Sequence, residues 1–343
     1  MFTEKQISEI KNHLEKAQNP VFFFDNDLDG LCSFLLLQRY IGRGKGVAIK
    51  SFPELDENYF RKVDELSADY IFILDKPLVS EGFVERVREK NIPIVWIDHH
   101  SIDTEISDFA DYYNPFLNKP STNEPVTALC YQIVQKKEDL WIGVLGSVAD
   151  YYLPEFYNEF SDKYPDLAID TKDPFEVIYN SKIGEIAKIL SNGLKDTITN
   201  VVIMLRFLLK TNSPYDILEE NSKTHNLHKR SNQIDQKYQR LLGNAKAFGN
   251  GKLLFFRYSG DLSVSGELSN NLKYLFPKRI IVVVYVKDTR ANLSLRGKNI
   301  KEVFLKAIQG LQGATGGGHD DAVGGQIQSK DLDKFKEKLE ELI

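Results

Sequence analysis

Short apolar runs alternate with amphipathic segments along the first hundred residues. The apolar runs have the length of buried strands, and the segments between them place apolar residues at helical spacing. The predicted strands are 21–24, 47–52, 70–74 and 94–97, and the predicted helices are 3–17, 31–41, 58–66 and 81–89. Alternation of strand and helix is typical of a doubly wound, mainly parallel sheet with helices on both faces.

The pattern changes after residue 100. A polar passage to Pro125 is expected to form a long loop, and residues 126–245 show mainly helical spacing. Strand and helix patterns alternate again from Gly251. This second set contains strands at 252–258, 279–287 and 291–296, and helices at 266–275, at 301–309 and from 330. We therefore predict an α/β protein with a larger lobe at 1–190, a helical linker at 191–250 and a smaller α/β lobe at 251–343.

The charge balance argues against a broad nucleic-acid-binding surface. Lys and Arg number 44 against 49 Asp and Glu, which gives a formal net charge of −5. A polyanion would therefore have to bind a local patch or a metal ion. The basic residues between 223 and 240 are either a solvated helix face or a contact for phosphate.

The remaining composition is that of an ordinary soluble protein. Cys32 and Cys130 lie in apolar segments and are expected to pack without forming a disulfide. The first ten residues lack the apolar core of a signal peptide, and no stretch approaches 18 consecutive apolar residues. We expect a cytoplasmic protein with no membrane partner.

Acidic and histidine side chains follow three of the predicted strands. Strand 21–24 leads into Asp25, Asp27 and Asp29, strand 70–74 leads into Asp75, and strand 94–97 leads into Asp98, His99 and His100. Ligands bind beyond the carboxyl ends of parallel strands, and hard divalent cations prefer carboxylate oxygens. The first cluster alone could be an Asp-rich turn, but its recurrence favours a metal site. Asp150, after an apolar helix, is a further candidate ligand.

A glycine-rich stretch near the C-terminus is the second candidate for chemistry. Gly316, Gly317 and Gly318 would expose backbone N–H groups to a phosphate, and His319 adds a donor. We expect this stretch to form a loop, with Arg296 on the other side of an anion site. It is neither a Walker loop nor a dinucleotide-binding fingerprint.

These motifs resemble those of a known family. The DHH phosphoesterases carry four motifs in order, which are resembled here by Asp25 to Gly30, Asp75, Asp98 to His100, and Asp150. The Gly-Gly-His signature of their C-terminal DHHA1 domain is resembled by Gly316 to His319, with Ala322, Gly324 and Gly325 following. The resemblance spans nearly the whole chain and is greatest to the RecJ-like and oligoribonuclease branch. It implies two lobes facing across a cleft, with the metal centre in the first and substrate held by the second.

The resemblance also implies a role for each motif residue. The implied metal ligands are Asp25, Asp27, Asp29, Asp75, His99 and Asp150. Asp75 would bridge two ions, Asp98 would orient His99, and His100 would face the scissile phosphate. The implied substrate contacts are Arg296, Gly316, Gly317, Gly318 and His319.

Two residues depart from the family pattern. Phe23 stands where the pyrophosphatase branch has its first histidine, which disfavours that branch. Lys76 follows Asp75, where many members have a small or polar residue, and would either alter the charge of the metal site or point to solvent. The extra nucleic-acid-binding domain of full-length bacterial RecJ has no counterpart here, which favours short substrates or a compact, archaeal type of exonuclease.

The resemblance implies an enzyme that hydrolyses phosphodiester bonds with two Mn²⁺ ions, Mg²⁺ or Co²⁺ being alternatives. The oxygen-rich ligand set favours manganese over zinc. The leading hypothesis is an exonuclease or oligonucleotidase that releases nucleoside monophosphates from single-stranded DNA or RNA. Alternatives are a phosphatase of cyclic dinucleotides or phosphorylated nucleotides, and a non-catalytic replisome scaffold. Replication or repair proteins as partners, and a homodimer, are left open.

Overall fold

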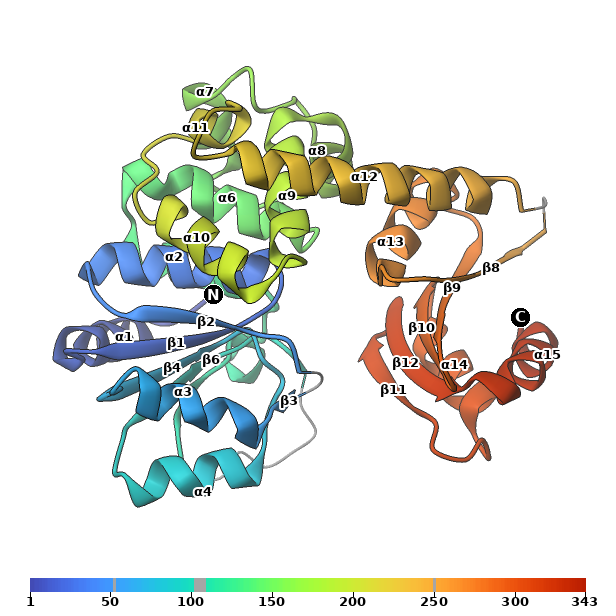
Figure 1. The fold of residues 1–343 in the computed structure, drawn as a ribbon, viewed down its shortest axis with the longest axis horizontal. Coiled ribbons are helices and arrows are strands. Elements are labelled where there is room, and N and C mark those ends of the chain that lie inside the picture. The colour runs from blue at the N-terminus through green and yellow to red at the C-terminus, as the bar shows by residue number, and fades with distance from the viewer. Residues whose placement is uncertain (52–53, 102–108, 249–250) are drawn as a thin grey trace. The chain divides into compact units, whose positions relative to one another are not determined.

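The computed structural model describes residues 1–51, 54–101, 109–248 and 251–343. The chain divides into two compact units, Met1–Ser231 and Asn232–Ile343, and the division falls within the long helix α12 (His225–Lys246). Figure 1 shows both units with their elements labelled. Each unit has its own sheet and its own core, as the two alternating patterns predicted.

The sheet of the first unit has five parallel strands in the order β2-β1-β4-β6-β7. They are β1 (Pro20–Asp25), β2 (Lys45–Ile49), β4 (Tyr70–Leu74), β6 (Ile94–Ile97) and β7 (Asp111–Tyr113). Phe24 pairs with Leu74, and Leu74 pairs with Ile97. The carboxyl ends of β1, β4 and β6 therefore lie side by side at one edge of the sheet.

Alternate residues of these strands enter two different cores, because successive side chains of a strand point to opposite faces. Phe22, Phe24 and Phe72 pack into the larger core, with helices α1 (Glu4–Lys16) and α2 (Leu28–Ile41). Phe23 and Ile73 face the other side, against α3 (Phe60–Glu65) and α4 (Glu81–Glu89). Figure 1 shows α2 on one face and α3 and α4 on the other. The predicted doubly wound sheet is confirmed.

Further helices extend the larger core of the first unit. They are α5 (Val126–Val134), α6 (Leu140–Ala149), α7 (Tyr157–Lys163), α8 (Pro174–Asn180), α9 (Lys182–Leu194), α10 (Ile198–Leu208) and α11 (Tyr215–Leu218). The prediction of one loop from 101 to Pro125 was wrong in part, because β7 and a 3-10 turn at Pro115–Leu117 lie within it. A small parallel sheet, β3 (Glu54–Leu55) with β5 (Leu78–Val79), was also missed because two-residue strands leave no periodicity. Residue 52, at the end of predicted strand 47–52, lies outside the described residues.

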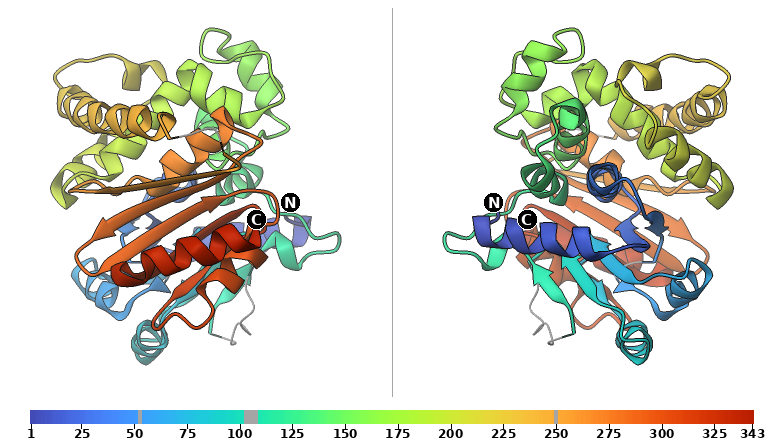
Figure 2. Two further views of the ribbon diagram at one scale, coloured as in Figure 1. Left: turned by 90° about the vertical axis from the view of Figure 1, so that its right-hand side faces the viewer. Right: turned by 90° about the vertical axis from the view of Figure 1, so that its left-hand side faces the viewer.

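The second unit is built on a mixed sheet of five strands in the order β11-β12-β10-β9-β8. The strands are β8 (Leu253–Ser259), β9 (Ile280–Lys287), β10 (Arg290–Arg296), β11 (Thr315–His319) and β12 (Ala322–Gln328). Helix α13 (Ser265–Leu275) packs on one face, and α14 (Ile300–Ile308) and α15 (Leu332–Leu342) pack on the other. Figure 2 shows α15 lying across its face of this sheet. The predicted smaller α/β lobe is confirmed.

The glycine-rich stretch does not form the predicted loop. Gly316 to His319 belong to β11, which pairs antiparallel with β12 in a hairpin. A Cβ atom on Gly316 would lie 2.3 Å from Cε1 of Phe304. The strand can therefore lie this close to α14 only because residue 316 is glycine, a packing requirement that the sequence did not reveal.

Two further expectations concern the cysteines and the membrane. Cys32 and Cys130 are both buried and unpaired, as predicted. None of the helices among the described residues combines the length and the apolar character needed to cross a bilayer.

Candidate metal centre

The first acidic motif links the end of β1 to the start of α2. Asp27 caps the helix, because its Oδ1 accepts a hydrogen bond of 3.0 Å from the N–H of Gly30. A Cβ atom on Gly30 would lie 2.5 Å from the carbonyl oxygen of Asp25, so only glycine allows this close approach. Asp25, Asp27 and Asp29 are thus held around one tight strand-to-helix turn.

Asp29 is buried and is fixed by backbone donors. Its Oδ2 accepts from the N–H of Val126 at 2.8 Å, and its Oδ1 accepts from the N–H of Thr127 at 2.6 Å. These are the free N–H groups of the first turn of α5, which favour a negative charge. Sequence reasoning missed this contact, because it joins residues about a hundred positions apart.

Asp75 follows β4 with a left-handed backbone, φ +57°. Asp tolerates this conformation better than most residues, and such strain is concentrated at functional sites. Its side chain is buried, and its Oδ1 makes no hydrogen bond. A buried carboxylate oxygen without a donor is costly, so this atom fits a metal ligand.

His99 lies at the centre of the acidic residues. Its Nε2 is 3.4 Å from Oδ1 of Asp75, and 3.9 Å from Oδ2 of both Asp29 and Asp150. Asp150 is the residue that follows α6. The imidazole is buried, and its Nδ1 makes no hydrogen bond.

The predicted pairing of Asp98 with His99 was wrong. Nδ1 of His100 lies 2.7 Å from Oδ1 of Asp98, whose other oxygen accepts from the hydroxyl of Tyr112 at 3.2 Å. Adjacent residues in an extended chain point their side chains in opposite directions, whereas residues two positions apart point the same way. The side chain of His100 therefore lies on the same side as that of Asp98, and the side chain of His99 does not. Asp98 therefore orients the second histidine of the motif.

The ligand atoms gather into three overlapping groups, and within each group all atoms lie within 4.8 Å of one another. The groups are Asp25 with Asp27 and Asp75; Asp29 with His99 and Asp150; and Asp75 with His99 and His100. All six predicted metal ligands occur in these groups. Asp75 and His99 each belong to two of them.

Family models then identify the chain. The model of the DHH family N-terminal domain matches residues 21–151, and the model of the DHHA1 domain matches residues 250–343. Between them they match more than half of the chain. The chain belongs to the DHH phosphoesterases. Members of this superfamily include metal-dependent phosphoesterases and nucleases.

Solved structures show the same fold. RecJ from Thermus thermophilus in complex with Mn²⁺ is 16% identical, with a TM-score of 0.68, and the match covers 98% of this chain and 53% of that one. An exonuclease RecJ bound to manganese is 14% identical, with a TM-score of 0.65 and coverage of 98% and 92%. CDC45 from Entamoeba histolytica is 9% identical, with a TM-score of 0.52 and coverage of 98% for both chains. This DHH protein spans about half the length of the Thermus RecJ. No curated protein sequence matches it.

Three acidic side chains of the DHH site have raised pKa values. Desolvation by the surrounding protein, followed by the charge of neighbouring carboxylates, raises the pKa of the buried Asp75 well above the usual range. The same causes raise the pKa of Asp27, although Asp27 is exposed to solvent. The same causes, opposed by His99, raise the pKa of Asp150 to about 7, although its side chain is 44% exposed. A bound cation would relieve the repulsion between these carboxylates. The Oδ1 atom of Asp75, which is buried without a hydrogen-bond donor, is available to such a cation.

His100 is positively charged at neutral pH, in contrast to the carboxylates around it. Burial alone would lower its pKa, but the hydrogen bond and charge of Asp98, with Asp75 and Asp150, raise the pKa to about 10. His100 is therefore a positively charged donor beside the acidic groups, and its side chain remains 31% exposed.

Lys76 was predicted either to change the charge of the site or to point to solvent. Its side chain is completely buried, so the second alternative is excluded. Nζ donates hydrogen bonds of 2.8 Å to Oδ1 of Asp25 and to the carbonyl oxygen of Ser51. In the sequence, only the position of Lys76 directly after Asp75 indicated that this lysine could belong to the site.

The predicted substrate residues lie in the second unit. Arg296 ends β10, and its guanidinium donates to Oδ1 of Asn270 and to the carbonyl oxygen of Leu295. Gly316 to Gly318 and His319 are exposed on β11, an edge strand of the sheet. An edge strand presents backbone N–H groups that no neighbouring strand takes up.

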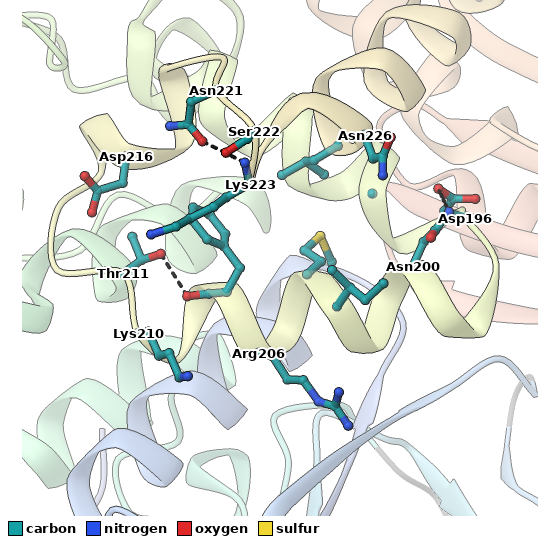
Figure 3. A pocket seen from close by; sticks show the side chains of 15 residues that line it. Asp196, Asn200, Arg206, Lys210, Thr211, Asp216, Asn221, Ser222, Lys223 and Asn226 are labelled. Atoms are coloured by element: carbon teal, nitrogen blue, oxygen red, sulfur yellow. Dashed lines mark hydrogen bonds between the residues drawn. The ribbon is translucent and has the colours of Figure 1, made fainter.

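A separate cavity of about 610 Å³ lies in the first unit, away from the motif residues (Figure 3). Met204, Phe207 and Leu227 contribute apolar lining, while Lys210 and Lys223 are among the charged residues around it. None of the predicted metal ligands or substrate residues lines it.

Proposed function

We propose that this DHH phosphoesterase is a manganese-dependent phosphodiesterase of the RecJ-like type, acting on the ends of single-stranded DNA or RNA or on short oligonucleotides. The observation that carries the proposal is the position of Asp75. Its buried, unbonded Oδ1 lies 3.4 Å from Nε2 of His99, between two groups of potential ligands. A carboxylate shared by two groups suits a pair of divalent ions.

The residues present fit such a pair. Asp25, Asp27 and Asp75 would hold one ion, and Asp29, His99 and Asp150 would hold the other, with Asp75 shared. These donors are mainly carboxylate oxygens, which favours Mn²⁺ or Mg²⁺ over zinc. When bound, the ions supply Lewis-acid activation of a water molecule and of the phosphate group.

The protein itself contributes positioning and charge. The N–H groups of Val126 and Thr127 hold Asp29 in one orientation. Asp98 keeps His100 protonated, so that its imidazolium can donate to an oxygen of the scissile phosphate and stabilise developing negative charge. We further propose that Arg296, His319 and the backbone N–H groups of Gly316 to Gly318 bind other phosphates of the substrate.

A product-length assay tests the proposal. End-labelled single-stranded DNA, RNA and dinucleotides are incubated with the protein and Mn²⁺, and products are resolved by length. We expect stepwise shortening and release of nucleoside monophosphates, with Asp75→Asn as the inactive control. Full-length products from every substrate would overturn the proposal. Cyclic dinucleotides and phosphorylated nucleotides are tested in parallel reactions. If only these are hydrolysed, the protein is a phosphatase of such nucleotides and not an exonuclease.

A further inference from the structure

Lys76 places a buried positive charge beside the candidate ligand group of Asp25, Asp27 and Asp75. Its side chain is completely buried, and Nζ lies 2.8 Å from Oδ1 of Asp25. An ammonium group is strongly disfavoured away from water unless it is paired and hydrogen-bonded. The carboxylate of Asp25 and the carbonyl oxygen of Ser51 meet this need.

The sheet topology holds the lysine in place. Lys76 comes after β4, Asp25 ends β1, and Ser51 comes after β2, and these three strands are neighbours in the order β2-β1-β4. The side chain therefore reaches across three adjacent strand ends. Nε1 of Trp96 also donates to the carbonyl oxygen of Lys76 at 2.8 Å, which fixes the backbone.

The charge is distributed unequally between the two ligand groups. Asp25 belongs to the group with Asp27 and Asp75, and one of its oxygens is already bonded to an ammonium. Within the described residues, no lysine or arginine forms an ion pair with Asp29 or Asp150, which belong to the group around His99. A fixed positive charge repels a divalent cation a few ångströms away.

We propose that Lys76 is a positioning residue that holds Asp25 through one oxygen and weakens cation binding at the group of Asp25, Asp27 and Asp75. The two ions then bind unequally: the group around His99 fills first, and the group beside Lys76 fills at higher metal concentration. This inference rests on the proposed two-metal site but concerns the order of binding, which the proposed function leaves open.

Mn²⁺ titration of the full-length protein without substrate tests it, by calorimetry and by electron paramagnetic resonance. Wild type is expected to bind two ions with unequal Kd values. Lys76→Gln keeps a hydrogen-bond donor but removes the charge. Lys76→Gln should lower the Kd of the more weakly bound ion at least about tenfold, as expected for a unit charge near a divalent ion at an effective dielectric constant of about 20. Lys76→Met should lower this Kd similarly, whereas His99→Ala should abolish binding of the more tightly bound ion.

The matched control is Lys90→Met, which removes a lysine paired with Asp64 at the surface. It should leave both Kd values unchanged. A folded Lys76→Gln protein with wild-type Kd values would overturn the inference. So would two equal Kd values in wild type, a result that needs no variant to fold. Absence of any Mn²⁺ binding would instead reject the proposed function itself, so the two failures are distinguishable.

Discussion

Nδ1 of His100 lies 2.7 Å from Oδ1 of Asp98, a carboxylate with no exposed surface. A buried negative charge at this distance strongly favours the protonated imidazole, which is why the pKa of His100 rises to about 10. The Asp-His-His motif thus supplies His99 as a candidate metal ligand, while Asp98 keeps His100 protonated.

The first prediction concerns the alkaline limb of the activity profile. Wild-type activity should decline at alkaline pH, where His100 loses its proton, because Asp98 raises the pKa of His100. Asp98→Asn removes the charge that raises this pKa, so the decline should move to lower pH. Initial rates across the neutral and alkaline range measure it. Tyr112→Phe is the control, because it leaves the Asp98 charge in place. An unchanged alkaline limb in Asp98→Asn would reject the role of His100 as a charged donor.

The second prediction concerns stability in chelator. The pKa values of Asp27, Asp75, Asp150 and His100 are all raised in the folded protein, so it binds more protons than the unfolded chain. Their contribution is therefore present at low pH and is lost as pH rises, for Asp150 between the usual Asp pKa of about 4 and about 7. The melting temperature in EDTA should fall over this range. Saturating Mn²⁺ should reduce or reverse the fall, and a rising melting temperature in EDTA would contradict the prediction.

The third prediction tests the shared carboxylate. Asp75→Asn keeps a residue that tolerates φ of +57°, where alanine would add strain. Hydrolysis should fall at least about a hundredfold, beyond the effect typical of groups that only support metal ligands. Thermal stability in chelator should be unchanged or higher, because a repelling charge is removed. Undiminished Mn²⁺-dependent turnover would refute the assigned role.

The fourth prediction separates Asp29 from the other ligands. Asp29→Ala leaves the buried N–H groups of Val126 and Thr127 without an acceptor, so it should reduce the free energy of unfolding by about 1–3 kcal/mol. Urea unfolding in chelator measures this loss, with Asp75→Asn as the control. Equal stability of the two variants would show that Asp29 does not support α5. Asp75→Asn is accordingly the better inactive protein for substrate-binding measurements.

The fifth prediction concerns the glycine strand. A Cβ atom on Gly317 would meet no other atom within 4 Å, so Gly317→Ala should leave the fold intact. If the N–H groups of β11 bind phosphate, the added methyl should raise KM about fivefold with little change in kcat, as for one weakened hydrogen bond. Gly266→Ala, which also has open space around it, is the control in the same unit. An unchanged KM would remove β11 from the proposed substrate contacts.

The two alternating strand-and-helix patterns and the candidate ligands follow from the order of residues alone. Buried parallel strands need apolar runs such as 21–24 and 70–74, and parallel strands bring their carboxyl ends to one edge. The sequence therefore predicts that Asp25, Asp75 and His99 lie close together at this edge. Periodicity also placed most of the helices, since an amphipathic helix must turn one apolar face to the core.

Tertiary structure alone decided which partner each of these side chains has. Asp98 contacts His100 instead of His99, and Asp29 bonds to N–H groups of α5 that lie about a hundred residues away. The sequence left open whether Lys76 alters the charge of the site or points to solvent. It is buried because the order β2-β1-β4 brings Asp25 and Ser51 within reach of its ammonium. The residue order in the chain specifies which groups occur, but hydrogen bonds and ion pairs form between atoms a few ångströms apart. Only the packing of the strands and helices sets those distances.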